Sequence, residues 1–117
     1  MNLTLPFPPS SNRYWRSTVR AGFVRTYKSK EAKEYSALAY WTAKQQCGDP
    51  LEGDVIVRGV IYFPDRRGDL DNRLKVLLDA LEGAAYTNDK QVVRIDVAKD
   101  YDKERPRVEL EVTNAIG

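Results

Sequence analysis

The stretch that decides the fold is Asp-Val-Ile-Val-Arg-Gly-Val-Ile-Tyr-Phe at residues 54–63, and Pro64 follows it directly. Valine and isoleucine are enriched in strands, and apolar residues occupy both alternating sides of this run. The pattern predicts a central strand that is buried on both faces. Pro64 ends it, because proline has no backbone N–H to donate to a neighbouring strand.

Two helices are predicted on either side of this strand. After it, residues 70–81 carry leucines at i, i+4, i+7, i+8 and i+11, namely Leu70, Leu74, Leu77, Leu78 and Leu81. Gly83 supplies the C-terminal stop of that helix. Before the strand, residues 30–47 favour a helix that ends at Gly48 and Pro50. Its predicted inner face consists of Tyr35, Leu38, Ala39 and Thr42.

Three further strands and a long loop complete the predicted secondary structure. Residues 91–99 and 107–113 alternate between apolar and polar positions, and we interpret them as a hairpin joined by the charged turn 100–106. Their inward positions are Val93, Ile95 and Val97 in the first strand and Val108, Leu110 and Val112 in the second. Residues 3–7 favour an edge strand because prolines follow. Residues 10–28 are interpreted mainly as a long functional loop, with a weakly indicated strand at 23–27.

The order of these elements predicts one α+β domain over residues 1–117, with two main helices packed on a mixed sheet. A chain of 117 residues that is 42% hydrophobic can form one core but not two. No apolar run approaches the roughly 20 residues that span a bilayer, and the N-terminus lacks the features of a signal peptide. We therefore expect a cytoplasmic protein that does not associate with membranes.

The composition restricts the chemistry that is available. The chain contains no histidine and one cysteine, Cys47. This excludes zinc sites with histidine ligands, Ser-His and Cys-His nucleophile pairs, and a zinc site built from several thiolates. If the protein is a catalyst, carboxylates, lysine and a bound metal must supply the chemistry.

Basic and aromatic residues are concentrated near the N-terminus. Residues 1–30 contain six of the 19 bases and none of the 17 acids, a charge of +6, and the remaining 13 bases and 17 acids give −4. Cationic side chains bind phosphates and aromatic rings stack on unpaired bases, although a charged run can also be a solvated surface. We predict nucleic-acid contacts from Arg13, Tyr14, Arg16, Arg20, Arg25 and Lys28, together with Arg66 and Arg67.

An acidic pair lies between the central strand and the leucine-faced helix. Residues two apart in an extended segment point to the same side, so Asp69 and Asp71 can converge while Leu70 turns into the core. Gly68 allows a close backbone approach there. Lys75 lies one helical turn after Asp71. The same pattern is typical of a helix N-cap followed by an Asp–Lys pair, and this alternative stays open.

A third carboxylate, Asp89, is a candidate for the same site. It lies in the turn 87–90, where Asn and Asp are common because they bond their own backbone. A helix of about 12 residues is roughly 18 Å long, so the turn that follows it returns to the helix start only if another segment crosses back. Spacing alone therefore leaves open whether Asp89 reaches the pair.

Several separated motifs resemble the RusA family of Holliday-junction resolvases over nearly the whole chain. In order, they are Leu5-Pro6-Phe7-Pro8-Pro9-Ser10-Ser11-Asn12-Arg13-Tyr14, Pro64-Asp65-Arg66-Arg67-Gly68-Asp69-Leu70-Asp71-Asn72, Lys75, Asp79-Ala80-Leu81 and Asn88-Asp89-Lys90-Gln91-Val92-Val93. The resemblance implies a small homodimeric endonuclease that cuts four-way DNA junctions with Mg²⁺ or Mn²⁺. It also implies a bacterial or phage gene, often carried by a prophage.

The resemblance assigns the catalytic and metal-binding acids to Asp69, Asp71 and Asp89, and an essential lysine to Lys75. Two positions depart from the family pattern. Asn88 replaces a second acid that often accompanies the last carboxylate, and Gly68 stands where another base can occur, which predicts weaker junction binding. Two alternatives remain: a DNA-binding module without catalysis, and an endonuclease that acts on other branched or duplex DNA.

Overall fold

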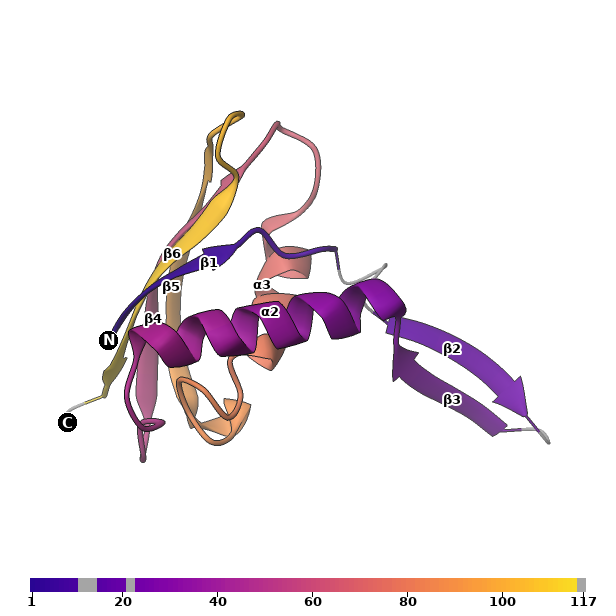
Figure 1. Ribbon diagram of the computed structural model, residues 1–117, viewed down its shortest axis with the longest axis horizontal. Helices are drawn as coiled ribbons and strands as arrows, with labels where there is room; N and C mark the ends of the chain where they lie inside the picture. The colour runs from indigo at the N-terminus through magenta and orange to yellow at the C-terminus, as the bar shows by residue number, and fades with distance from the viewer. Residues whose placement is uncertain (11–14, 21–22, 116–117) are drawn as a thin grey trace.

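The protein has a four-stranded sheet with both long helices on one side of it and a two-stranded ribbon that projects beyond them (Figure 1). The computed structural model describes the backbone of residues 1–10, 15–20 and 23–115, and the side chains of residues 1–10 and 28–115. The elements are β1 (Asn2–Pro6), β2 (Trp15–Arg20), β3 (Phe23–Lys28), α2 (Lys30–Gln46), β4 (Val55–Phe63), α3 (Leu70–Ala80), the 3-10 helix η1 (Asp89–Gln91), β5 (Val92–Tyr101) and β6 (Arg107–Asn114). The predicted α+β class with a mixed sheet is confirmed.

The main sheet has the strand order β1-β6-β4-β5. β4 pairs in parallel with β5 and antiparallel with β6, and β1 is antiparallel to β6 at the other edge. The predicted hairpin between β5 and β6 is wrong, because β4 lies between them. The crossover through α3 carries the chain from the end of β4 back to its start, so β5 begins beside the start of β4 and runs parallel to it.

The core fills the space between one face of the sheet and the two helices. Val55, Val57, Ile61 and Phe63 of β4 are fully buried there with apolar residues of α2 and α3. On the opposite face, Ile56, Val60 and Tyr62 are only partly buried. The prediction of two buried faces is wrong because both helices cover the same face of the sheet.

β5 is an edge strand whose apolar side chains are only partly buried. Val97 packs against the core as predicted, but Val93 is 55% exposed and Ile95 is 44% exposed. Ile95 is level with Val57 of β4 and shares its face, whereas Val93 stands at a register shift between the two strands. The prediction that these two residues are buried is therefore wrong, and the free edge of the sheet carries two apolar side chains.

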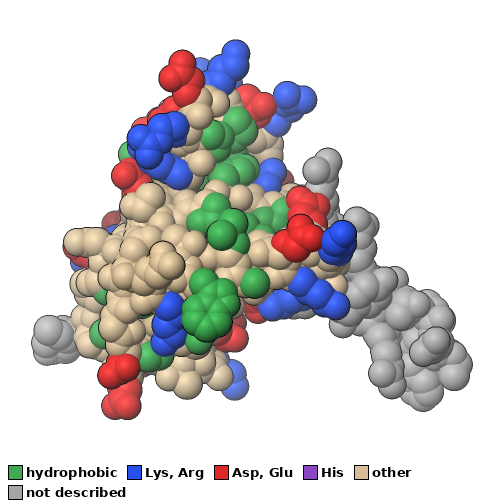
Figure 2. All heavy atoms as spheres, in the orientation of Figure 1, with side chains coloured by type: hydrophobic (Ala, Val, Ile, Leu, Met, Phe, Trp, Pro, Cys, Tyr) green, Lys and Arg blue, Asp and Glu red, His purple; other side chains and the backbone are tan. Residues whose placement is uncertain are grey.

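Helix α2 packs through small residues. Ser29 caps its start by accepting a hydrogen bond from Ala32 N, at 3.1 Å. Its buried residues are Ala32, Tyr35, Ala39 and Ala43. Leu38 was predicted to face inward but is 56% exposed, because it lies about 100° around the helix from Ala39. Figure 2 shows apolar side chains among acidic and basic ones on the face of the molecule that carries α2.

Residues 15–28 form a ribbon rather than the predicted loop. β2 and β3 pair antiparallel from Trp15 with Lys28 to Arg20 with Phe23, and positions 21–22 lie outside the described residues. The weakly indicated strand at 23–27 is confirmed as most of β3. The ribbon extends away from the main sheet (Figure 1). In the part of the chain that the structure describes, no helix is long and apolar enough to cross a membrane.

Candidate active site

The acidic pair lies at the start of α3, directly after the loop that follows β4. Asp69 is the N-cap residue and Asp71 is in the first turn, and both are exposed. Leu70 is already the first helical residue, so the pair is not on an extended segment, but Leu70 does pack against the core as predicted. Asp69 makes no side-chain capping bond. Its carboxylate instead accepts a hydrogen bond from Asn72 Nδ2 at 3.2 Å.

Lys75 follows Asp71 by one helical turn and is exposed, as predicted. Within the described residues, neither side chain forms an ion pair or a hydrogen bond. The structural alternative requires a side-chain N-cap bond and an ion pair between Asp71 and Lys75. The described residues form neither of these contacts. Two carboxylates and an ammonium group are left facing solvent at one helix end.

The loop at residues 64–68 is held by its own polar groups. Asp65 Oδ1 accepts a hydrogen bond from Arg67 N at 2.9 Å, and Oδ2 pairs with Arg67 Nη2 at 3.1 Å. These hydrogen bonds lower the pKa of the Asp65 carboxyl. Gly68 has a φ of 88°, a backbone conformation that other residues rarely adopt, immediately before Asp69. The contacts of Asp65 therefore hold residues 65–67, and Gly68 then turns the chain into α3.

Arg66 and Arg67, the predicted phosphate contacts of this loop, are both exposed beside the acidic pair. The Arg66 guanidinium lies 5.6 Å from the centroid of the Tyr101 ring of β5. A cavity of about 340 Å³ opens next to them. Its lining consists of Phe7, Ser10, Pro64, Asp65, Arg67, Gly68 and Arg73. The position of the two arginines fits contact with a phosphate close to the carboxylates.

Arg73 and Lys99 also hold this corner, and the sequence analysis missed them. Arg73 Nη1 donates to Pro8 O at 2.6 Å, and its guanidinium lies 4.8 Å from the Phe7 ring centroid. Lys99 Nζ donates to Gly68 O at 2.8 Å. Both side chains bind main-chain carbonyls, which leave no signal in a sequence because every residue has one.

Asp89 lies at the opposite end of α3. It begins η1, after the helix has ended, and its backbone N–H donates to Glu82 Oε1 at 2.8 Å. At 1.5 Å per residue, the 11 residues of α3 separate this end from Asp69 by about 16 Å. Asn88, the departure from the family pattern, is the N-cap of η1 and accepts from Lys90 N at 2.9 Å. One chain does not bring Asp89 to the acidic pair.

The donors at the acidic pair suit a hard divalent cation. Exposed carboxylate oxygens that are not used for capping are the ligands that Mg²⁺ takes in proteins. Among the described residues of one chain, however, no group of three acidic or thiol side chains is close enough to share an ion. A single chain therefore offers Asp69 and Asp71 as part of a ligand set.

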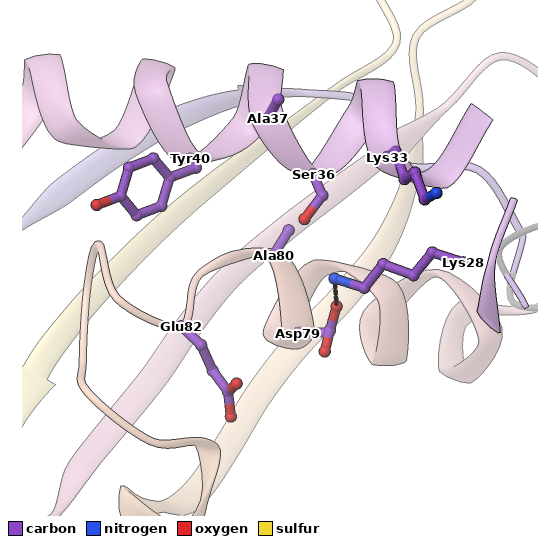
Figure 3. A pocket seen from close by; sticks show the side chains of 8 residues that line it. All are labelled: Lys28, Lys33, Ser36, Ala37, Tyr40, Asp79, Ala80 and Glu82. Atoms are coloured by element: carbon purple, nitrogen blue, oxygen red, sulfur yellow. Dashed lines mark ion pairs between the residues drawn. The ribbon is translucent and has the colours of Figure 1, made fainter. Parts of the chain in front are cut away.

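The other predicted DNA contacts lie on or near the ribbon. Arg13 and Tyr14 are outside the described residues, and for Arg16, Arg20 and Arg25 only the backbone is described. Lys28 forms an ion pair within the protein, because its Nζ lies 3.0 Å from Asp79 Oδ2 of α3. Figure 3 shows this ion pair in a pocket of about 430 Å³ between α2 and α3. The pair joins the base of the ribbon to the helical layer.

Comparison with known proteins gives a consistent match along the chain. The family described as endodeoxyribonuclease RusA matches residues 6–113. The crossover junction endodeoxyribonuclease RusA of Escherichia coli strain K12 is 37% identical over 115 residues, which cover 96% of this chain and 92% of the relative. The proteins of the same name from Shigella sonnei and Enterobacteria phage 82 share the same identity and coverage.

Proposed function

This chain belongs to the RusA family of endodeoxyribonucleases, and on that premise we propose that it resolves four-way DNA junctions by paired hydrolysis of phosphodiester bonds. The relatives it matches are named for cutting crossover junctions. The observation that carries the proposal is the exposed acidic pair at the start of α3, which makes no helix cap and no ion pair with Lys75. These carboxylate oxygens are exposed and available to a divalent cation, for which they are suitable ligands.

The cofactor in this proposal is Mg²⁺, for which Mn²⁺ can substitute. Asp69 and Asp71 would hold the ion together with Asp89. When bound, such an ion lowers the pKa of a coordinated water and neutralises charge that develops on the phosphate. Lys75, one turn from Asp71, would stabilise the negative charge of the phosphate in the transition state with its ammonium group.

A homodimer would supply the third acid. Asp89 lies in η1, just before β5, while the loop before Asp69 contacts Lys99 near the end of β5. If two β5 edges approach antiparallel about a two-fold axis, the start of one strand lies beside the end of the other. Exposed edge strands pair readily, and the apolar Val93 and Ile95 on this edge favour burial. Two sites related by symmetry would match the two cuts.

The basic ribbon is the proposed DNA-binding arm. Arg16 and Arg20 belong to β2 and Arg25 belongs to β3, so both strands of the ribbon carry bases. A two-stranded ribbon is narrow enough to enter the major groove of DNA. Arg66 and Arg67 would add phosphate contacts next to the acids. The relatives from a bacterium and a phage support a role on DNA in the bacterial cytoplasm.

Cleavage of a synthetic four-way junction tests the function. Wild type should nick the junction with Mg²⁺ and not with EDTA, and Asp71→Asn should bind the junction without nicking it. Lys75→Met should also bind without cutting. Tight binding by wild type with no product at any Mg²⁺ concentration would instead identify a DNA-binding module. Equal cutting of linear duplex in a competition assay would identify a nuclease of different specificity.

A further inference from the structure

Lys99 is a half-buried cation that makes contacts with the loop before the acidic pair. It lies on β5, opposite Ile61 of β4 and on the core side of the sheet. Its Nζ donates to Gly68 O at 2.8 Å and to Arg66 O at 3.3 Å. Within the described residues it forms no ion pair with an acid. The ammonium group therefore directs its donors to main-chain carbonyls.

Two aromatic rings fix the position of this ammonium group. Its Nζ lies 4.5 Å from the ring centroid of Phe63, which is fully buried, and 5.6 Å from that of Tyr101. Cation–π attraction favours this placement and compensates in part for the lost hydration of the charge. The last buried residue of β4 thus provides a rigid base for the contact between Lys99 and the loop.

The contact with Gly68 acts directly on Asp69. The Gly68 carbonyl and the Asp69 N–H belong to the same planar peptide unit. A hydrogen bond that fixes this carbonyl also fixes the plane of the Gly68–Asp69 peptide. It therefore limits the directions in which the Asp69 carboxylate can point. Gly68 has a φ of 88° and can rotate more freely than other residues, so the peptide plane needs an external restraint.

We propose that Lys99 is a positioning residue that orients Asp69 for metal binding by holding the Gly68–Asp69 peptide, an inference that rests on the proposed function. Groups that orient metal ligands typically change metal affinity by about 10-fold to 100-fold when they are removed. Lys99 acts through the backbone and does not itself touch the metal or the DNA phosphate.

Mn²⁺ binding without DNA tests this role separately from activity. The free-ion electron paramagnetic resonance signal should show about 10-fold weaker Mn²⁺ binding for Lys99→Met. Junction binding in EDTA should match wild type, and cleavage should need about 10-fold more Mg²⁺ for its half-maximal rate. Lys103→Met removes the same charge from an exposed position in the turn before β6 and should behave as wild type.

Lys99→Arg keeps a charged donor and should bind Mn²⁺ within about threefold of wild type. This rescue would show that the weaker binding of Lys99→Met comes from the lost contact and not from a loss of folding. Circular dichroism checks that each variant is folded, and if Lys99→Met does not fold, Lys99→Leu, which also lacks a hydrogen-bond donor, takes its place with the same expected direction. Unchanged Mn²⁺ affinity in a folded neutral variant would overturn the proposal. Weaker junction binding in EDTA with normal Mn²⁺ affinity would also overturn it, because Lys99 would then be a DNA contact. Junction cleavage by wild type reports separately on the proposed function.

Discussion

Asp69 occupies a helix N-cap without acting as one. A capping Asp normally stabilises a helix by accepting a backbone N–H, and its loss costs about 1 kcal/mol. Here the carboxylate makes no such bond and lies close in sequence to a second acid, Asp71. We therefore expect Asp69→Ala to change the free energy of unfolding by less than about 0.5 kcal/mol. Urea unfolding followed by circular dichroism measures this value.

Ser29 provides the matched control at the other helix. It accepts a hydrogen bond from Ala32 N at the start of α2, so Ser29→Ala should lower the free energy of unfolding by about 1 kcal/mol. A loss of similar size for Asp69→Ala would show that its carboxylate caps α3 in solution. That result would remove the argument that this acid is kept for function.

Asp102 makes stability depend on pH at the turn between β5 and β6. Arg107 Nη1 donates to its Oδ2 at 2.7 Å, and this bond lowers the pKa of Asp102 below its usual 3.8. As the pH falls, Asp102 therefore takes up its proton at a higher pH in the unfolded chain than in the folded one. The stability that this bond contributes is fully present above the pKa of Asp102 in the unfolded chain. It is lost as the pH falls through the pKa of Asp102 in the folded chain.

Asp102→Asn should therefore lower the melting temperature at pH 7, and the difference from wild type should shrink as the pH falls below 4. Differential scanning calorimetry across this range measures the effect. Glu104→Gln is the control, because it removes a negative charge from the same turn. Within the described residues Glu104 forms no ion pair with Arg107. A difference for Asp102→Asn that stays constant to pH 2 would contradict the argument.

Gly59 allows β4 and β6 to pair closely. A Cβ at this position would overlap the carbonyl oxygen of Glu109 and lie 2.9 Å from Leu110 Cα, both of which are backbone atoms of β6. The strand cannot yield without breaking its ladder, so Gly59→Ala should destabilise the protein by more than about 2 kcal/mol. Gly48→Ala is the control, since a Cβ there has no atom within 4 Å. Thermal melts that match for the two variants would contradict this account.

Element type could be predicted from periodicity, but strand partners could not. β4 and α3 were located to within one residue because their apolar patterns are strong. Alternation also located β5 and β6, yet it says nothing about the neighbour of a strand, and the parallel crossover through α3 was missed. The ribbon was taken for a loop because residues 10–28 are polar, basic and aromatic without a clear period of two.

The candidate site was predictable where it is local in sequence. Asp69, Asp71 and Lys75 lie within seven residues, so the helix that carries them fixes their relation. Lys99 was missed because its partners are carbonyls, which carry no residue-specific signal. Asp89 was a reasonable candidate by type, but one chain holds it beyond the far end of α3. In the proposed homodimer its relation to the pair would depend on the assembly, which a single sequence does not encode as a local pattern.

Mixed dimers test whether two chains build each site. Asp71→Asn and Asp89→Asn should each abolish nicking as homodimers. A heterodimer of the two, purified by two different tags, should contain one intact site and one doubly substituted site if Asp89 acts on the partner's acidic pair. It should therefore nick junctions at about half the wild-type rate, without paired cuts, because closed two-fold symmetry gives two sites per dimer.

A heterodimer of Asp69→Asn with Asp71→Asn separates this result from simple subunit mixing. Both substitutions fall on the same side of a shared site, so every site in that heterodimer carries a defect and no nicking is expected. If each site were built within one chain, the Asp71→Asn and Asp89→Asn heterodimer would also be inactive, because each subunit would carry its own defect. Gel analysis of nicked and resolved junctions therefore distinguishes a site shared across the β5 edges from one completed by a movement of Asp89 within a single chain.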